Sequence, residues 1–307
     1  MDITAKIYHD EDAAREHLEQ IRWPNGAVCP VCERTETVSA LGGKSMGPGW
    51  YHCNACRKKF TVRVGTIYER SKIALHKWVL ATHLYASSKK GMSAHQLHRM
   101  LGITYKSAWF MAHRIRESMR EFNPDQFGGE GKTVEADETF IGGKQANKHK
   151  SKRSPYRLGG SWGKEMAFAL VERGGRVRTV HTPRVNAATL LPILKEQLHP
   201  STKLMTDDAG QYRHMHRDFD HQIVNHSAGE YVRGDAHTNT IENYFSILKR
   251  GITGVYQAVS KKHLKRYLGE FDFRYNYRHV DDFERAVAII KGAEGKRLTY
   301  RRTAAWA

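Results

Sequence analysis

The sequence contains no apolar run long enough to cross a membrane and no N-terminal segment of the signal-peptide type. Cysteine is rare, because only 4 occur among 307 residues. These absences argue against a membrane protein and against a secreted disulfide scaffold, so we expect a soluble cytoplasmic protein. Acidic residues are also in deficit, with 32 Asp and Glu against 50 Lys and Arg and a formal net charge of +18. That surplus indicates a polyanionic partner, nucleic acid before membrane, although charge alone establishes neither.

The four cysteines form two Cys-x-x-Cys pairs that are separated by 20 residues. Two such pairs present four thiolates, which is the ligand set of a closed tetrahedral Zn²⁺ site joined by a short hairpin. A redox or incidental cysteine pair is the alternative. The segment is also too small to hold a fold of its own without metal. We therefore expect one structural zinc ion with the ligands Cys29, Cys32, Cys53 and Cys56.

Residues 61–121 have the composition of helices, and within them residues 93–109 follow the pattern of a helix-turn-helix. Ser93 is placed to cap a first helix, Gly102 interrupts it, and apolar residues recur at helical spacing on both sides. In such a motif the second helix carries the residues that contact DNA bases. We expect these side chains to be exposed there: Tyr105, Lys106, His113, Arg114 and Arg116. Lys106 and Arg114 lie two turns apart and are the predicted DNA-binding pair, although a plain helical hairpin with solvated charges fits the same pattern.

A short β-prone run over residues 134–141 contains Asp137 and ends at a Gly-Gly turn signal. A carboxylate inside an apolar strand is costly to bury without a compensating positive charge, and a salt bridge alone would supply one. The next stretch, residues 144–157, holds six Lys or Arg and no acid. We expect a mobile loop there that contacts DNA phosphate through Lys152 and Arg153, although a solvated insert fits nearly as well.

Two later stretches place further acids at the ends of regular elements. Asp207 ends the strand 204–207, with Asp208 next to it, and Glu242 lies beside an apolar stripe of helical spacing. From the first acidic strand on, the order is strand, strand, strand, helix, strand, helix, strand, helix, which is that of a ribonuclease H-like α/β fold. This fold is a mixed sheet with flanking helices in which the first and fourth strands are neighbours. Asp137 and Asp207 would then lie side by side.

Asp137 and Asp207 on strands, with Glu242 on a helix, resemble the DDE triad of transposases and retroviral-type integrases. Lys249, seven positions after the glutamate, belongs to the same pattern, and Arg250 follows it. With its zinc ribbon and helical segment, nearly the whole chain resembles the zinc-ribbon transposases of bacterial insertion sequences. The stretches that resemble the third catalytic block and the C-terminal signature of that group are 237–242, 249–252 and 269–278. We expect the last of them to be a core-packing helix.

The resemblance implies two Mg²⁺ or Mn²⁺ ions at the catalytic carboxylates, with Asp137 bridging both and Asp207 and Glu242 each holding one. It implies double-stranded DNA as the partner (element ends and target), DNA contacts from Lys249 and Arg250, a homo-oligomer on DNA and a bacterial cytoplasmic location. The expected activity is cleavage at the element ends and joining of the 3′-hydroxyls to target DNA. A DNA-binding regulator with an inactive core, and a nuclease that hydrolyses without joining, are the alternatives.

These assignments predict five parts of the chain. They are an N-terminal helix and zinc ribbon (1–60), a helix-turn-helix-like segment (61–122), a linker (123–132), a ribonuclease H-like catalytic domain with C-terminal helices (133–290) and a basic tail (291–307).

Overall fold

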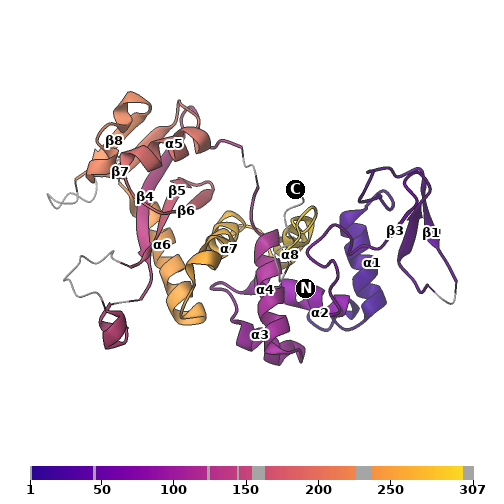
Figure 1. The fold of residues 1–307 in the computed structure, drawn as a ribbon. Coiled ribbons are helices and arrows are strands. Elements are labelled where there is room, and N and C mark those ends of the chain that lie inside the picture. Colours follow the sequence, from indigo (N-terminus) through magenta and orange to yellow (C-terminus); the bar gives the residue numbers. More distant parts are fainter. Residues whose placement is uncertain are drawn as a thin grey trace. The chain divides into compact units, whose positions relative to one another are not determined.

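The computed structural model describes residues 2–43, 46–122, 125–143, 145–153, 163–225, 235 and 237–299. The chain divides into two compact units (Figure 1). The first comprises residues 1–120 together with 279–307, and the second comprises residues 121–278. Among the described residues, no helix has both the length and the apolar character needed to cross a membrane.

The first unit begins with a helix and a small sheet. Asp10 accepts a hydrogen bond from the amide of Ala13 and so caps α1 (Glu11–Arg22), which follows the short helix η1 (Lys6–Tyr8). The sheet that follows is antiparallel, in the order β1 (Val38–Leu41), β2 (Trp50–Cys53) and β3 (Lys58–Phe60). This is the hairpin architecture that the cysteine spacing predicts.

The described part of the first unit also contains the helices α2 (Leu75–Ser87), α3 (Ala94–Leu101), α4 (Tyr105–Ser118) and α8 (Asp282–Lys291). The helix pair expected over residues 93–109 is confirmed. Ser93 caps α3, Thr104 caps α4, and Gly102 ends α3 with a φ of 59°, a conformation that favours glycine. Residues 61–74, in contrast, contain no helix. Arg63 donates to two carbonyls there, those of Ser71 and Ile73, and so holds an irregular loop.

The C-terminal residues differ from their predicted assignment. Helix α8 was expected in the catalytic domain, yet it belongs to the first unit, where it packs against α1, α2 and α4. The residues after it, expected as a basic tail, also pack there as far as they are described. The amide of Gly295 donates to the carbonyl of Gly65, and Lys296 donates to the carbonyl of Ser118.

The second unit is built on a five-stranded mixed sheet in the order β6-β5-β4-β7-β8. Its strands are β4 (Thr133–Ile141), β5 (Glu165–Glu172), β6 (Val177–Thr182), β7 (Lys203–Asp207) and β8 (Asp220–Val224). The first three are antiparallel to one another, whereas β4–β7 and β7–β8 pair in parallel. The predicted adjacency of the first and fourth strands is therefore confirmed, and the topology is that of a ribonuclease H-like sheet.

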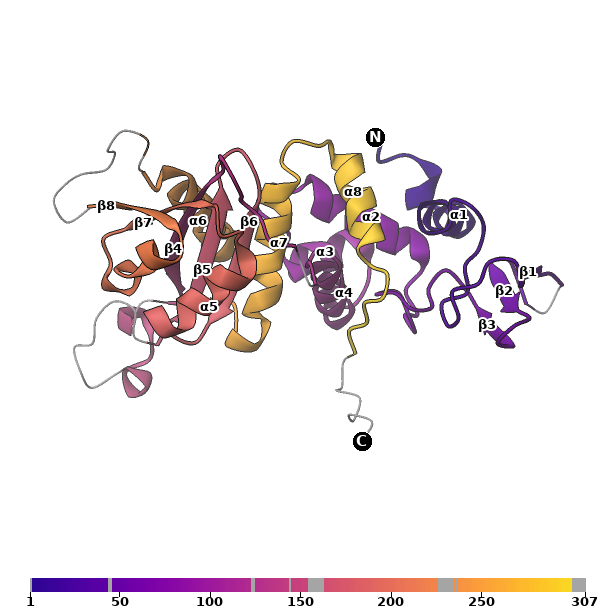
Figure 2. The same cartoon turned by 90° about the horizontal axis from the view of Figure 1, so that it is seen from above.

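Helices cover both faces of this sheet, as Figure 2 shows. One face packs Val134 and Ala136 against α5 (Ala187–Gln197). The other face packs Ala167 and Ala169 against α6 (Asn239–Gly251), which continues as the π-helical turn Ile252–Tyr256, and against α7 (Leu264–Asn276). The expectation of a core-packing helix near the C-terminal signature is confirmed, because Phe271 and Phe273 of α7 are buried.

Two predicted connections take a different form. The helix expected between β7 and β8 is replaced by the short turns η4 (Gly210–Tyr212) and η5 (Met215–Arg217), whose Tyr212 and Met215 are buried in the core that faces α5. The expected linker 123–132 is also not free where it is described. Phe127 is buried in the same core and exchanges backbone hydrogen bonds with Gln197 and His199, so this segment belongs to the second unit.

Asp272 on α7 joins three elements of the second unit. Its carboxylate accepts hydrogen bonds from the amide and hydroxyl of Thr179 on β6 and from the hydroxyl of the buried Tyr244 on α6. Asp272→Ala is expected to lower the free energy of unfolding by about 1–3 kcal/mol for each donor left unsatisfied. Urea denaturation measures this loss, and Glu196→Ala, at an exposed position of α5, should change stability by no more than about 0.5 kcal/mol. Equal stability of the two variants would contradict this role.

Candidate functional site

The first two predicted acids lie beside each other on one face of the sheet. The β4–β7 ladder ends with Glu135 opposite Met205. Continuing the same register by two residues brings Asp137 level with Asp207. Since side chains alternate along a strand, Asp137 shares the face of Ile141, which packs in the α6 core, and not that of Ala136.

The neighbouring acid Asp208 is placed differently. It follows the last residue of β7, is exposed, and by the alternation of the strand would point to the face opposite that of Asp207. Asp207 is half-buried and accepts a hydrogen bond from the amide of Ala209. The geometry therefore favours Asp207 over Asp208 as the acid next to Asp137, a choice that the residue pattern alone left open.

Glu242 reaches the same region from α6. Ile241, Phe245 and Leu248 are buried at helical spacing against the sheet, which leaves Glu242 on an exposed face of the helix. Its Oε1 accepts a hydrogen bond of 3.2 Å from the hydroxyl of Thr238, the residue that precedes α6.

The electrostatics of Asp137 link the three acids. Burial raises the pKa of Asp137 to about 7, and the negative charges of Glu138, Asp207 and Glu242 contribute to the rise. A group of carboxylates that disfavour one another's ionisation in this way is a site that cations stabilise. Among the described residues, the group of three or more potential metal ligands that lies close together is the cysteine cluster, whose donor atoms are all within 4.8 Å of one another.

A fourth carboxylate, Glu138, lies next to Asp137 but is held on the other face of the strand. Its oxygens accept hydrogen bonds from Gln211 Nε2 at 2.7 Å and from the hydroxyl of Tyr212, and both donors follow β7. Burial raises the pKa of Glu138, and the charge of Asp207 adds to this effect. Glu138 therefore belongs to the electrostatic surroundings of the site, with its own oxygens already hydrogen-bonded.

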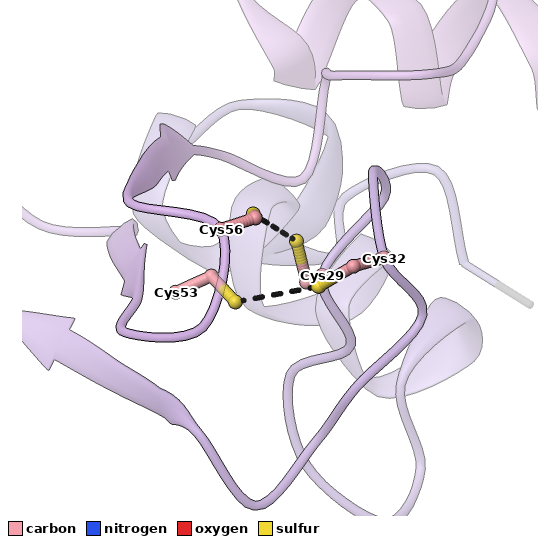
Figure 3. A group of neighbouring side chains, drawn as sticks. All are labelled: Cys29, Cys32, Cys53 and Cys56. Carbon is pink, nitrogen blue, oxygen red and sulfur yellow. Dashed lines mark hydrogen bonds between the residues drawn. The ribbon is translucent and has the colours of Figure 1, made fainter.

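The four cysteines come together in the first unit (Figure 3). Sγ of Cys29 lies 3.5 Å from Sγ of Cys56, Cys32 and Cys53 are also 3.5 Å apart, and all four sulfur atoms lie within 4.8 Å of one another. A tetrahedral zinc site with Zn–S bonds of about 2.3 Å requires sulfur atoms about 3.8 Å apart, so these positions fit the ion.

The two cysteine pairs sit in turns of the same shape. In each, the residue after the second cysteine has a positive φ, 58° at Glu33 and 57° at Arg57. The amide of that residue donates to the carbonyl of the first cysteine, at 2.9 Å and 2.8 Å. Such paired turns aim the thiols of both pairs at one point, and the closed set of four sulfurs leaves no position for a reacting ligand, as in structural zinc sites.

The expectation that the basic residues of α4 are exposed is wrong for three of them. His113, Arg114 and Arg116 are 1%, 7% and 2% exposed. The guanidinium of Arg114 donates to the carbonyls of Ile67, Glu69 and Leu298, so it ties α4 to the loop before α2 and to the segment after α8. Arg114 is therefore a structural residue that cannot contact bases in this conformation. Lys106 and Tyr105, in the first turn of α4, are exposed as predicted.

The other predicted DNA contacts are exposed where the structure describes them. Lys249 and Arg250 lie on the exposed side of α6, and Arg250 hydrogen-bonds back to Ser246. In the basic stretch, Arg153 donates to the carbonyls of two earlier loop residues. Lys152 lies in the short helix η3 (Lys150–Lys152), and its side chain is outside the described part, as are residues 144 and 154–162.

Sequence reasoning missed Glu135, which is completely buried on β4 two residues before Asp137. Its carboxylate accepts hydrogen bonds from the start of α6 and from Arg173. The available signal was the alternation of the strand, which puts Glu135 on the same face as Asp137. Its partners are far away in sequence, and no pattern near Glu135 predicts them.

Comparison with known proteins identifies two domains in the chain. Residues 128–276 match the family described as the ISXO2-like transposase domain, and residues 9–59 match the transposase zinc-ribbon domain. A Halobacterium salinarum protein described as an uncharacterized protein in transposable element ISH50 is 30% identical over 279 residues, 88% of this chain and 92% of that protein. An uncharacterized transposase-like protein of Haemophilus influenzae is 32% identical over 117 residues, 38% of this chain and 91% of that protein.

Among solved structures, the Mos1 strand transfer complex aligns with a TM-score of 0.29 and 15% identity, over 72% of this chain and 79% of that chain. The domain matches and the relative that spans most of the chain suffice to assign the family. The chain belongs to the insertion-sequence transposases that carry a transposase zinc ribbon and an ISXO2-like transposase domain.

Proposed function

We propose that this transposase binds the ends of its insertion sequence, cleaves phosphodiester bonds there and joins the resulting 3′-hydroxyls to target DNA. One observation carries the proposal. Asp137 and Asp207 lie level on one face of neighbouring strands, and the charges of Asp207 and Glu242 act on Asp137. The catalytic acids are therefore Asp137, Asp207 and Glu242.

The three carboxylates fit divalent cations by their chemistry. Mg²⁺ prefers carboxylate oxygens and keeps waters and substrate phosphate oxygens as further ligands, and Mn²⁺ accepts the same donors. Asp137, whose pKa is raised by burial and by the neighbouring charges, would hold a pair of such ions together with Asp207 and Glu242. When bound, such a pair of ions activates the attacking water or 3′-hydroxyl and stabilises the leaving oxygen of an in-line displacement.

The protein's own groups set the site around these acids. Thr238 donates to Glu242 and restricts its carboxylate. Gln211 and Tyr212 hold Glu138 with its oxygens turned to the other face of β4. Lys249 lies two turns beyond Glu242, so its ammonium group is available to contact a DNA phosphate near the reacting bond.

Recognition of the element ends belongs, in this proposal, to the first unit, with the exposed start of α4 entering a DNA groove. The net charge of +18 supports binding to duplex DNA. Because one transposition event joins two element ends, at least two active sites are needed, so the working form on DNA is a homo-oligomer.

Lys106→Ala should weaken binding to the cognate end by about 1–3 kcal/mol and change binding to random DNA little, as expected for a base-reading residue. Arg114→Ala should act differently, because its guanidinium holds three carbonyls. It should lower the free energy of unfolding of the first unit by at least the value of one hydrogen bond to a charged group, about 1.5–3 kcal/mol.

Titration of labelled cognate and random duplexes, with urea unfolding of each variant, separates these effects. Alanine at both Lys152 and Arg153 provides the contrast, since loss of phosphate contacts should weaken all DNA alike and flatten the salt dependence. A Lys106 variant that loses affinity for both duplexes equally would place Lys106 among phosphate contacts.

The proposed function is tested with a duplex that carries the element's own terminal repeat. With Mg²⁺ we expect cleavage at the element end that leaves a free 3′-hydroxyl, and with EDTA no cleavage. Specific binding to the terminal repeat without cleavage in Mg²⁺ or Mn²⁺ would instead indicate a DNA-binding regulator.

A further inference from the structure

We infer that Glu135 is a positioning residue that sets the start of α6, and therefore Glu242, relative to Asp137. The inference rests on the proposed function. Glu135 has no exposed surface, and it lies two residues before Asp137 on the same face of β4. Ile241, whose amide it binds, directly precedes Glu242. A single carboxylate thus connects the strand that carries one catalytic acid to the helix that carries another.

Glu135 acts as the cap of α6 from another element. Its Oε2 accepts the amide of Ile241 at 2.9 Å, and its Oε1 accepts the hydroxyl of Thr240 at 2.8 Å. The first amides of a helix have no partner within the helix, and a negative charge is favourable there. Thr238, at the usual capping position, makes no capping hydrogen bond, since its hydroxyl donates to Glu242. The cap has therefore been supplied by β4, while the local residue restrains Glu242.

Arg173 extends this anchor to the chain that leads into α6. Its Nε donates to Oε1 of Glu135 at 2.7 Å, and its two terminal nitrogens donate to the carbonyls of Asp235 and His237 at 2.8 Å and 2.9 Å. The amide of Arg173 donates to the carbonyl of Thr133 at the start of β4. Arg173 thus holds β4 and the entry to α6 at once. Nδ1 of His237 lies 3.3 Å from Glu135 Oε1, but the two atoms do not form a hydrogen bond.

An ion pair that buries its carboxylate completely and its guanidinium in part is a poor choice for stability alone. Removing two charges from water costs free energy that their attraction often fails to recover, and apolar residues of similar volume commonly serve as well. The pair instead fixes the positions of the groups that it joins, because each hydrogen bond forms only over a narrow range of distances and angles. The group whose position is fixed in this way is Glu242, which follows Ile241, the residue whose amide donates to Glu135. Groups that orient metal ligands in this way strongly affect metal affinity and activity.

The second unit offers a matched control. Glu270 is also completely buried, and it pairs with Arg274 at 2.6 Å on the same helix, α7. It accepts a hydrogen bond from Tyr256 but contacts neither the start of α6 nor the catalytic acids in the bonds described. Glu270→Gln therefore removes a buried carboxylate from an ion pair without releasing the start of α6.

The experiment compares wild type, Glu135→Gln and Glu270→Gln as full-length proteins. It measures urea unfolding, Mn²⁺ binding by electron paramagnetic resonance, and kcat and KM for cleavage of the terminal-repeat duplex. Both variants should lose stability. Glu135→Gln alone should weaken Mn²⁺ binding and lower kcat, each by roughly 10- to 100-fold, with KM for DNA within about twofold of wild type. Hydrogen exchange at the amide of Ile241 should rise in the same variant.

Wild-type Mn²⁺ affinity and kcat in folded Glu135→Gln would overturn the inference. The same loss in Glu135→Gln and Glu270→Gln would also overturn it. If Glu135→Gln does not fold, Arg173→Lys serves instead, since lysine keeps the charge but cannot hold the carboxylate and both carbonyls, and the same loss is expected. A wild-type protein that neither binds Mn²⁺ nor cleaves DNA would defeat the proposed function itself. If only the inference fails, wild type will cleave DNA, and the two variants will not differ from each other in Mn²⁺ affinity or kcat.

Discussion

Replacing any one of Asp137, Asp207 and Glu242 by its amide is expected to abolish DNA cleavage and joining while leaving binding to the element ends largely intact. An amide retains the size of the carboxylate but not its charge, and the charge is what divalent cations need. Metal ions supply several kcal/mol of transition-state stabilisation. At about 1.4 kcal/mol for each factor of ten, a loss of roughly 10³-fold or more in rate should follow. Cleavage rates and gel-shift titrations with the terminal repeat measure the two properties separately.

Asp208→Asn is the control for this series, because Asp208 is an exposed acid directly next to Asp207 and belongs to the opposite face by the alternation of the strand. It should retain nearly the wild-type rate. Strand transfer near the wild-type rate in any amide variant of the three acids would remove that residue from the site. If the Asp207 variant were active and the Asp208 variant inactive, the assignment of the second acid would have to be exchanged.

Loss of zinc should produce the second large effect. Structural zinc sites in small domains contribute about 10–16 kcal/mol of binding free energy, which is also folding free energy. We expect about one zinc ion per chain in the purified protein, as one set of four thiolates implies. Cys53→Ser should then unfold the ribbon and abolish end binding, with the unit of residues 121–278 still folded. Hydrogen exchange resolved along the chain locates the loss.

His52→Ala is the matched control for the zinc experiment. His52 neighbours Cys53 but hydrogen-bonds to Asn54 and is no member of the sulfur cluster. This variant should keep its zinc and its affinity for DNA. A protein that contains no zinc, or a ribbon that stays protected after chelation, would contradict the assignment of a structural metal site.

The parts of the fold that depend on local patterns could be predicted from the sequence. The two cysteine pairs, the glycine that ends α3 and the apolar alternation around Asp137 each act within a few residues, and the structure has them as expected. The pairing of β4 with β7 followed from the order of elements, because a ribonuclease H-like sheet makes these strands neighbours.

The errors come from contacts between residues far apart in sequence. Arg114 is a basic residue on the second helix of the pair, as expected of a DNA contact. However, its guanidinium binds the carbonyl of Leu298, which lies 184 positions later in the chain. Phe127 stands in a glycine-rich stretch that is typical of a linker, yet it packs in the core that faces α5. Glu135 reads as one more acid near Asp137 until Arg173, 38 positions away, is found against it. Periodicity and composition carry no information about such partners.

Strand joining distinguishes a transposase from a nuclease, and it can be measured directly. A pre-cleaved terminal repeat with a labelled 3′-hydroxyl is incubated with the protein, Mg²⁺ and an unlabelled target plasmid, and the label covalently attached to the plasmid is measured. Wild type is expected to transfer the label, whereas the Asp137→Asn protein, which still binds the end, should transfer none. Nicked plasmid without attached label would mean that the site hydrolyses DNA without joining it, and equal transfer by the Asp137→Asn protein would mean that the catalytic site lies elsewhere.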